Sequence, residues 1–159
     1  MNGKGITRRT MAGALVLAPT GLTLAQGVDA NVNRSQSDRN FAETERDLLA
    51  GRTPINSGIM LDIPTLSENG NSVDVAIKVD SPWTREDHVR VVHILSEMNP
   101  FPVVARFQLG YRAGRADVAT RIRLAATQKV VVLAETTRGL IHRAEQEVIV
   151  ILGACLEGG

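Results

Sequence analysis

Apolar residues at every second position recur along the chain from residue 59 onward. Ile59, Leu61 and Ile63 alternate up to Pro64, and the same spacing continues through residues 73–79. A period of two places successive side chains on opposite faces of an extended strand, so one face of each segment can be buried. The pattern predicts seven or eight strands, over residues 59–63, 73–79, 89–95, 103–109, 118–124, 129–134, 140–143 and 147–152.

Turn signals separate these segments. Residues 68–71 (Glu-Asn-Gly-Asn), 99–102 (Asn-Pro-Phe-Pro) and 110–114 carry them. Strands that begin about 8 to 14 residues apart are typical of an all-β sandwich or barrel, and we expect an immunoglobulin-like antiparallel β-sandwich. The 159 residues are enough for one such domain, and its core must be aliphatic because only 3% of residues are aromatic.

One short helix precedes the strands. Phe41, Thr44 and Leu48 lie at helical spacing, and Gly51 is a stop signal, so residues 41–50 are predicted to be helical and to cover an open end of the core. The polar residues 26–40 before it form a flexible lead. The immunoglobulin-like domain itself is therefore expected over residues 41–152.

The first 25 residues are typical of a targeting segment. Arg8 and Arg9 precede a stretch of small and apolar residues, which indicates a twin-arginine signal peptide over residues 1–25. This stretch is too short and too weakly apolar for a permanent membrane anchor. We therefore expect export to the periplasm without a membrane anchor.

Cys155 is the only cysteine and follows the last predicted strand. Gly153 and Ala154 precede it, and Gly158 and Gly159 close the chain, so residues 153–159 are predicted to form a mobile tail. The periplasm is oxidising, and structural cysteines there normally come in pairs. A single cysteine in an exported protein indicates intermolecular pairing or a reactive thiol.

Other site chemistries have weaker support in the sequence. His88 and His93 are five residues apart, which places them on opposite faces of a strand. No metal site and no cofactor are therefore expected. Both residues are interpreted as solvated or strand-edge histidines. Arg106, Arg121 and Arg123 are interpreted as solvated surface. Without residues 1–25 the chain has 15 basic and 17 acidic residues, so no nucleic-acid partner is expected.

A thiol enzyme that acts alone is a further alternative. It would need a histidine to activate the thiol, and His142 could supply one if residues 140–143 formed a hairpin with residues 147–150. A tail that swings away would not hold that geometry, and Glu157 disfavours the thiolate. We therefore expect no catalysis by this chain, and activation of the thiol by a partner's active site.

Taken in order, four stretches resemble SoxY, the carrier family of the bacterial thiosulfate-oxidising Sox system. They are residues 64–70 (Pro-Thr-Leu-Ser-Glu-Asn-Gly), 99–103 (Asn-Pro-Phe-Pro-Val), 119–124 (Ala-Thr-Arg-Ile-Arg-Leu) and the terminal Gly-Ala-Cys. The likeness covers the whole mature chain. The family's tail is typically Gly-Gly-Cys-Gly-Gly, whereas here Ala154 precedes the cysteine and Leu156 and Glu157 follow it.

The resemblance implies a fold and a set of partners. It implies an immunoglobulin-like sandwich that forms a heterodimer with a SoxZ-like subunit. It also implies that Cys155 is loaded with thiosulfate by a haem-containing enzyme and then visits a hydrolase and a sulfur dehydrogenase. The leading hypothesis is thus a covalent sulfur carrier, and the alternative is a non-catalytic periplasmic β-sandwich that serves only as an interaction module.

Overall fold

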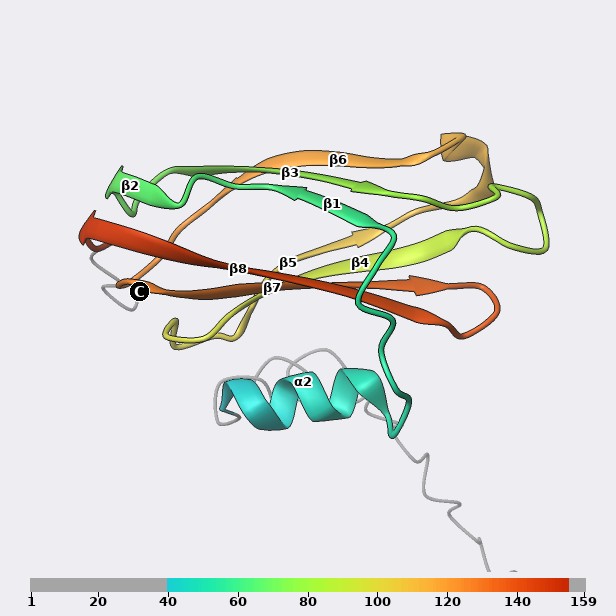
Figure 1. Cartoon of the computed structure of the whole chain (residues 1–159), viewed down its shortest axis with the longest axis horizontal. Coiled ribbons are helices and arrows are strands. Elements are labelled where there is room, and N and C mark those ends of the chain that lie inside the picture. The colour runs from blue at the N-terminus through green and yellow to red at the C-terminus, as the bar shows by residue number, and fades with distance from the viewer. Residues whose placement is uncertain (1–39, 155–159) are drawn as a thin grey trace, which may run out of the picture.

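The computed structural model describes residues 40–154 and forms two stacked sheets with one helix beneath them (Figure 1). The three-stranded sheet has the order β1-β3-β6 and the five-stranded sheet the order β2-β8-β7-β4-β5. The elements, in chain order, are α2 (Phe41–Leu49), β1 (Ile59–Asp62), β2 (Leu66–Asn69), β3 (Val73–Val79), β4 (Val89–Ser96), β5 (Val103–Gln108), the 3-10 turn η1 (Tyr111–Ala113), β6 (Ala116–Ile122), β7 (Gln128–Thr136) and β8 (Ile141–Leu152). The predicted all-β sandwich is confirmed.

Aliphatic side chains from both sheets form the core between them. In β3 every second residue is buried, from Val73 to Val79, as the alternation predicted. These side chains meet Val92 and Ile94 of β4 and Val130 and Val132 of β7, all fully buried. β-branched residues pack well on a pleated surface, so a core with few aromatic residues still fills this space.

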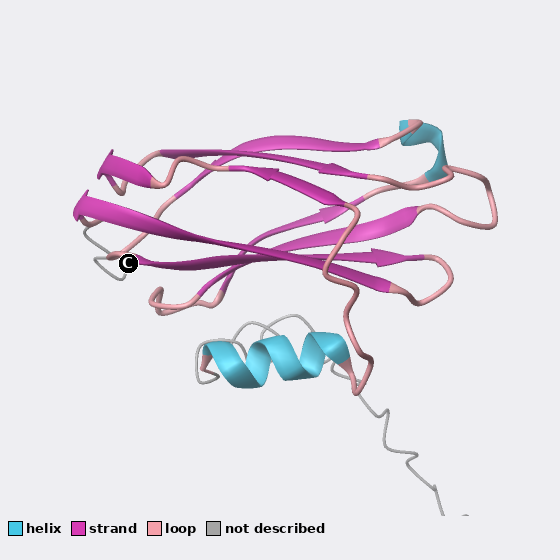
Figure 2. Ribbon diagram, viewed as in Figure 1, coloured by secondary structure: helices cyan, strands magenta, loops and turns pink. Residues whose placement is uncertain are grey.

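Helix α2 covers the outer face of the five-stranded sheet and not an open end of the core, which corrects our expectation (Figure 2). Its apolar face packs Phe41, Leu48 and Leu49 on a second buried cluster, which comprises Leu95, Val131, Leu133 and Ile141. β4 and β7 are therefore buried on both faces, and their sequences read as nearly continuous apolar runs.

Helix α2 has defined ends. The Asn40 side chain accepts a hydrogen bond from the Glu43 backbone N–H at 2.9 Å and so caps the first turn. Ala50 and Gly51 then take left-handed conformations that end the helix. The chain next runs along the edge of β8, where Ile55 bridges to His142 in parallel.

Ion pairs hold the helix and the following segment on the sheet. Glu135 on β7 accepts hydrogen bonds from Arg52 at 2.6 Å and from Arg90 at 2.7 Å. Burial raises the pKa of Glu135, but the two arginines outweigh this effect, so the pKa lies below its ordinary value. Arg143 on β8 donates to Glu45 of α2 at 2.8 Å.

Two strand predictions need correction. The turn was expected over residues 68–71 and no strand before it, but residues 66–69 form β2. β2 pairs in parallel with the end of β8, so the sandwich is not purely antiparallel. Residues 140–143 and 147–152 were expected to be separate strands, but residues 141–152 form the single 12-residue strand β8. The polar residues between them stay in the strand because β7 pairs with them continuously.

Truncation of a side chain under α2 should destabilise the fold. Leu133 is 2% exposed, so Leu133→Ala leaves a cavity and should lower the free energy of unfolding by about 2–5 kcal/mol. Leu140→Ala is the matched control, because Leu140 is 49% exposed, and its change should stay within about 0.5 kcal/mol. Urea unfolding measures both, and equal losses would argue against the packing of α2 on this face.

Acid should weaken the ion pairs at Glu135. Because its folded-state pKa lies below the ordinary value of 4.5, the carboxylate stabilises the fold above that pH, and this contribution is lost as the pH falls through the folded-state pKa. Glu135→Gln should therefore flatten the fall in unfolding free energy between about pH 5 and pH 3. The exposed Glu68→Gln serves as control and should keep the wild-type slope. Identical slopes in all three proteins would contradict the assignment.

Candidate functional site at the end of strand β8

Three backbone hydrogen bonds fix the chain where β8 ends. The Gly70 N–H donates to the Leu152 carbonyl at 2.7 Å, and the Leu124 N–H donates to the Gly70 carbonyl at 2.8 Å. The Ala154 N–H in turn donates to the Leu124 carbonyl at 2.9 Å. We call these residues, together with Gly153 and Ala125, the tail anchor. They join the turn after β2, the loop after β6 and the end of β8.

Two glycines allow this close packing. A Cβ atom added to Gly70 would collide with the Leu124 carbonyl oxygen, and one added to Gly153 would collide with the Ala125 carbonyl oxygen. Neither collision involves the flexible end of a side chain, so the backbone itself would have to move. The sequence suggested that Gly153 serves tail mobility, whereas in the structure its missing side chain serves contact with the domain.

A polar network supports the loop that receives Ala154. Asn99 donates to the Arg123 carbonyl at 2.8 Å and accepts from the Ala125 N–H at 3.0 Å. Gln128 donates to Asn99 Oδ1 and to the Ala126 carbonyl, both at 3.1 Å. From the sequence, Asn99 was interpreted only as a turn residue, and Gln128 was not singled out. The loop that both side chains support begins at Arg123, 24 residues after Asn99, so the sequence gives no sign of the contact.

An apolar strip borders the tail anchor. Leu66 of β2 lies beside Ile149 of β8 in the parallel register, and both are 52% exposed. Ile151 and Leu152, the last residues of β8, are exposed still further. These exposed residues, which we call the β2/β8 strip, lie at the end of β8, from which the chain continues toward Cys155.

The predicted tail residues divide into two groups. Gly153 and Ala154 lie within the tail anchor, and Ala154 is only 6% exposed. We expected the arm to begin at residue 153; since the described contacts hold both residues on the domain, its proposed start moves to Cys155. Cys155, Gly158 and Gly159 lie outside the described residues, as does the signal segment 1–25.

His142 lies far from the end of β8, because residues 141–152 form one strand and not the hairpin that could have brought His142 near the tail. Ten residues separate His142 from Leu152 along one strand, or about 33 Å. The three residues from Leu152 to Cys155 can span at most about 11 Å. His142 Nδ1 instead lies 2.8 Å from the Ser57 carbonyl oxygen. A thiol enzyme built on His142 and Cys155 is therefore excluded by chain length.

The other two histidines are buried, which corrects their interpretation as solvated. His88 and His93 are each 8% exposed. His88 packs between Trp83 and Tyr111, and its Nδ1 lies 3.0 Å from the Thr84 carbonyl oxygen. Within residues 40–154 no three His, Cys, Asp or Glu side chains are grouped closely enough to hold a metal ion.

Two solved structures with this fold illustrate what the chain is similar to. The sulfur carrier protein SoxY from Chlorobium limicola f thiosulfatophilum is 27% identical, with a TM-score of 0.55 over 69% of this chain and 96% of that one. A superoxide reductase (neelaredoxin) from Ignicoccus hospitalis is 15% identical, with a TM-score of 0.52 over 59% of this chain and 80% of that one. At that identity the second likeness shows the fold alone.

The family comparison covers most of the domain and reaches the cysteine. Comparison with curated protein sequences gave no match. The family model described as sulfur oxidation protein SoxY matches residues 45–155, so the match spans every strand, the tail anchor and Cys155. The chain therefore belongs to the SoxY family of sulfur oxidation proteins.

Proposed function

We propose that the protein is a periplasmic sulfur carrier that holds thiosulfate-derived intermediates covalently on Cys155 and presents them to partner enzymes. One observation carries the proposal: the family match extends to Cys155, the residue bonded directly to the last residue of the tail anchor. SoxY family membership and the likeness to a SoxY sulfur carrier support the broader role in sulfur oxidation.

The tail anchor suits a carrier because it fixes the base of the arm. Ala154 is buried, and its N–H donates a hydrogen bond to the Leu124 carbonyl. The domain therefore sets the position of the last residue before Cys155. A covalent tether gives its cargo a high effective concentration at each enzyme that docks on the domain. The reactive sulfur intermediate need not be released between steps.

The loading step requires an oxidant. Joining the Cys155 thiol to the outer sulfur of thiosulfate forms one S–S bond and releases one proton and two electrons. We assign those electrons to the haem-containing loading enzyme that the family resemblance implies. The hydrolase and the sulfur dehydrogenase of the pathway would then act on the bound sulfur. The chain itself supplies the thiol and the docking surface and catalyses no step.

The β2/β8 strip is the surface we assign to partner proteins. It exposes Leu66, Ile149, Ile151 and Leu152 beside the base of the arm, and exposed apolar patches of this kind mark protein interaction sites. A SoxZ-like subunit that covers this strip would form the proposed heterodimer. No helix within residues 40–154 is long and apolar enough to cross a membrane; periplasmic export rests on the twin arginines Arg8 and Arg9.

The same strip favours the second candidate, a module that only binds a partner. In that case the thiol would have no role. The two candidates differ in what Cys155→Ser does: a carrier loses thiosulfate oxidation and keeps its partner, whereas an interaction module keeps both. Co-purification with the SoxZ-like subunit reports partner binding separately from activity.

Protein isolated from cells grown with thiosulfate should carry a reducible adduct. An intact-mass spectrum without reductant should show added mass in sulfur-sized increments, and reduction should return the free thiol mass. Cys155→Ser, purified in the same way, should show no adduct and should fail to support thiosulfate oxidation. An unmodified wild-type thiol under these conditions would favour the interaction module.

Gly153→Ala should disturb the base of the arm. The added methyl group meets the Ala125 backbone, and overpacking of this kind costs about 1–3 kcal/mol of unfolding free energy. Gly110→Ala is the matched control, since an added Cβ there has no atom within 4 Å. Urea unfolding compares the two variants. A Gly153→Ala protein as stable as the control would show that the close approach to Ala125 is not a constraint.

A further inference from the structure

A basic groove lies on the outer face of the five-stranded sheet, beside α2. Two adjoining hollows make it up, with volumes of about 420 and 220 Å³, and both are lined by Arg90, Val91 and Arg106. Gln108 lines the larger hollow, and His93 lines the smaller one. We call this the arginine groove. Sequence analysis interpreted Arg106 as plain solvated surface and gave Arg90 no role.

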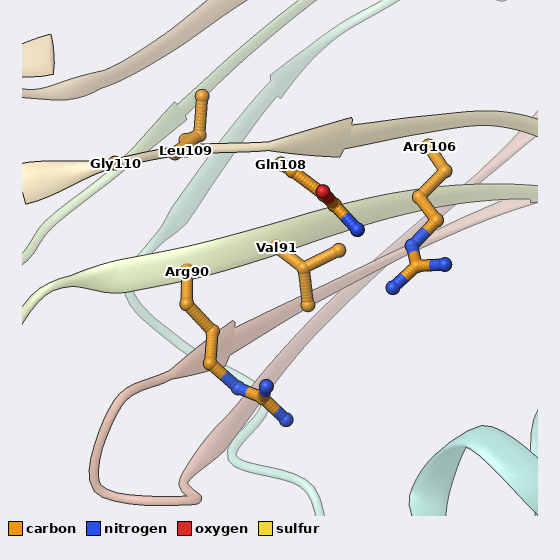
Figure 3. Close-up of a pocket in the computed structure, with 6 residues that line it drawn as sticks. All are labelled: Arg90, Val91, Arg106, Gln108, Leu109 and Gly110. Carbon is orange, nitrogen blue, oxygen red and sulfur yellow. The ribbon is translucent and has the colours of Figure 1, made fainter.

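A β-bulge brings the two arginines to the same side. In the pairing of β4 with β7, Val89 lies opposite Thr136 and Val91 opposite Glu135, so Arg90 is an extra residue between them. Such a bulge breaks the alternation and re-aims a side chain. Figure 3 shows Arg90 and Arg106 extending to the same side of the sheet, with Val91 between them.

The groove has more positive than negative charge. Glu135 is the carboxylate that lines it, and this group already pairs with both Arg52 and Arg90. Arg106 is exposed and has no ion pair or hydrogen bond with another side chain in residues 40–154. Its guanidinium therefore offers its full set of donors to a ligand, and a planar fork of N–H groups suits an oxyanion.

His93 adds an unused donor next to Arg106. The two residues are directly opposite each other in the pairing of β4 with β5. His93 is 8% exposed, and among residues 40–154 its buried Nδ1 has no hydrogen-bond partner. Burial lowers the pKa of His93, and the neighbouring Arg106 lowers it further, so the ring is neutral at neutral pH and can present one N–H. The ring lines the smaller hollow, where this N–H can serve as a donor.

The groove is separate from the proposed carrier site. His93 pairs with Leu133, and Leu133 pairs with Arg143, which lies nine residues before the end of β8. That separation is about 30 Å along the strand. An anion in the groove is therefore not cargo on Cys155, and its binding does not require that Cys155 carry sulfur.

We propose that the arginine groove binds a small tetrahedral oxyanion between Arg90 and Arg106, with His93 as a third donor. The charge of the groove opposes a metal cation, and the hollow of about 220 Å³ beside α2 suits a small ion better than an extended chain. Sulfate, thiosulfate and phosphate share the required chemistry: several acceptor oxygens and a negative charge that a guanidinium can bind in bidentate fashion.

The test is a titration of the full-length Cys155→Ser chain, which cannot be loaded covalently. Sulfate, thiosulfate and phosphate are added separately at constant ionic strength, with chloride as the balancing anion, and binding is followed by calorimetry and by the NMR signals of His93. Saturable binding with shifts at His93 is expected. Comparison of the three anions distinguishes a sulfur oxyanion from phosphate as the preferred ligand.

Charge-matched variants make the test specific. Arg106→Gln should weaken binding by about 10-fold or more, the loss typical of a charge-assisted hydrogen bond. Arg123→Gln removes the same charge from an exposed site after β6 and should leave binding unchanged. Arg106→Lys, which keeps the charge and loses the fork, should give an intermediate affinity. Circular dichroism verifies that each variant folds.

Three results would overturn the proposal. They are the absence of saturable binding in the folded protein, an equal effect of Arg106→Gln and Arg123→Gln, and binding of an acidic peptide such as oligoglutamate where none of the small anions binds. The last result would assign the groove to a protein partner.

Discussion

Strand β8 has to be held at both ends, and most of the described structure depends on how this is done. At its start, Ile141 lies under α2, Arg143 pairs with Glu45, and the segment at Ile55 covers the strand edge. At its end, Gly70 and Leu124 bind the last carbonyl and the chain beyond it. β7 pairs with most of β8, from Ile141 to Val148. Together with the contacts at the two ends, this pairing holds β8 as one continuous strand. The end of β8 is thereby presented at one fixed place.

The three-stranded sheet and helix α2 bury opposite faces of the five-stranded sheet. Three strands cover its inner face and α2 covers part of its outer face, so β4 and β7 are buried on both sides where they lie under α2. Where α2 does not cover it, the outer face has two areas of different chemistry. Toward the end of β8 it is apolar and exposed, and near the bulge in β4 it is basic and hollowed. The uncovered areas are the two surfaces that our proposals use.

The sequence predicts those parts of the fold in which local pattern and tertiary burial agree. The alternation in β3 is visible because one of its faces is buried and the other is not. The pattern fails at β2, which is short and lies at a sheet edge, and in the middle of β8, where backbone pairing with β7 keeps polar residues in the strand. The position of α2 also could not be predicted. A central strand reads as a nearly continuous apolar run, and this run does not tell whether the helix covers the outer face of the sheet or an open end of the core.

The sequence suggests the position of the proposed carrier residue, but not the contacts that hold the chain before it. A lone cysteine after a last strand points to Cys155, yet the support comes from Asn99, Gln128 and the backbone of Leu124, which are remote in sequence. Gly153 was interpreted as a source of backbone mobility. In a sequence, a glycine needed for close packing cannot be distinguished from a glycine needed for mobility. The bulge at Arg90 leaves no mark in the run Val-Arg-Val-Val that could distinguish it from a regular strand.

The parallel pairing of β2 with β8 also bears on how the chain reaches its folded state. Leu66 must find Ile149, about 80 residues later, and such non-local pairing is slow to form. Until β8 has been synthesised, β7 and β2 both present open edges, and open edges invite pairing with other chains. A chain that ends before β8 keeps both of these edges open, so the five-stranded sheet can close only in a chain that includes the whole of β8.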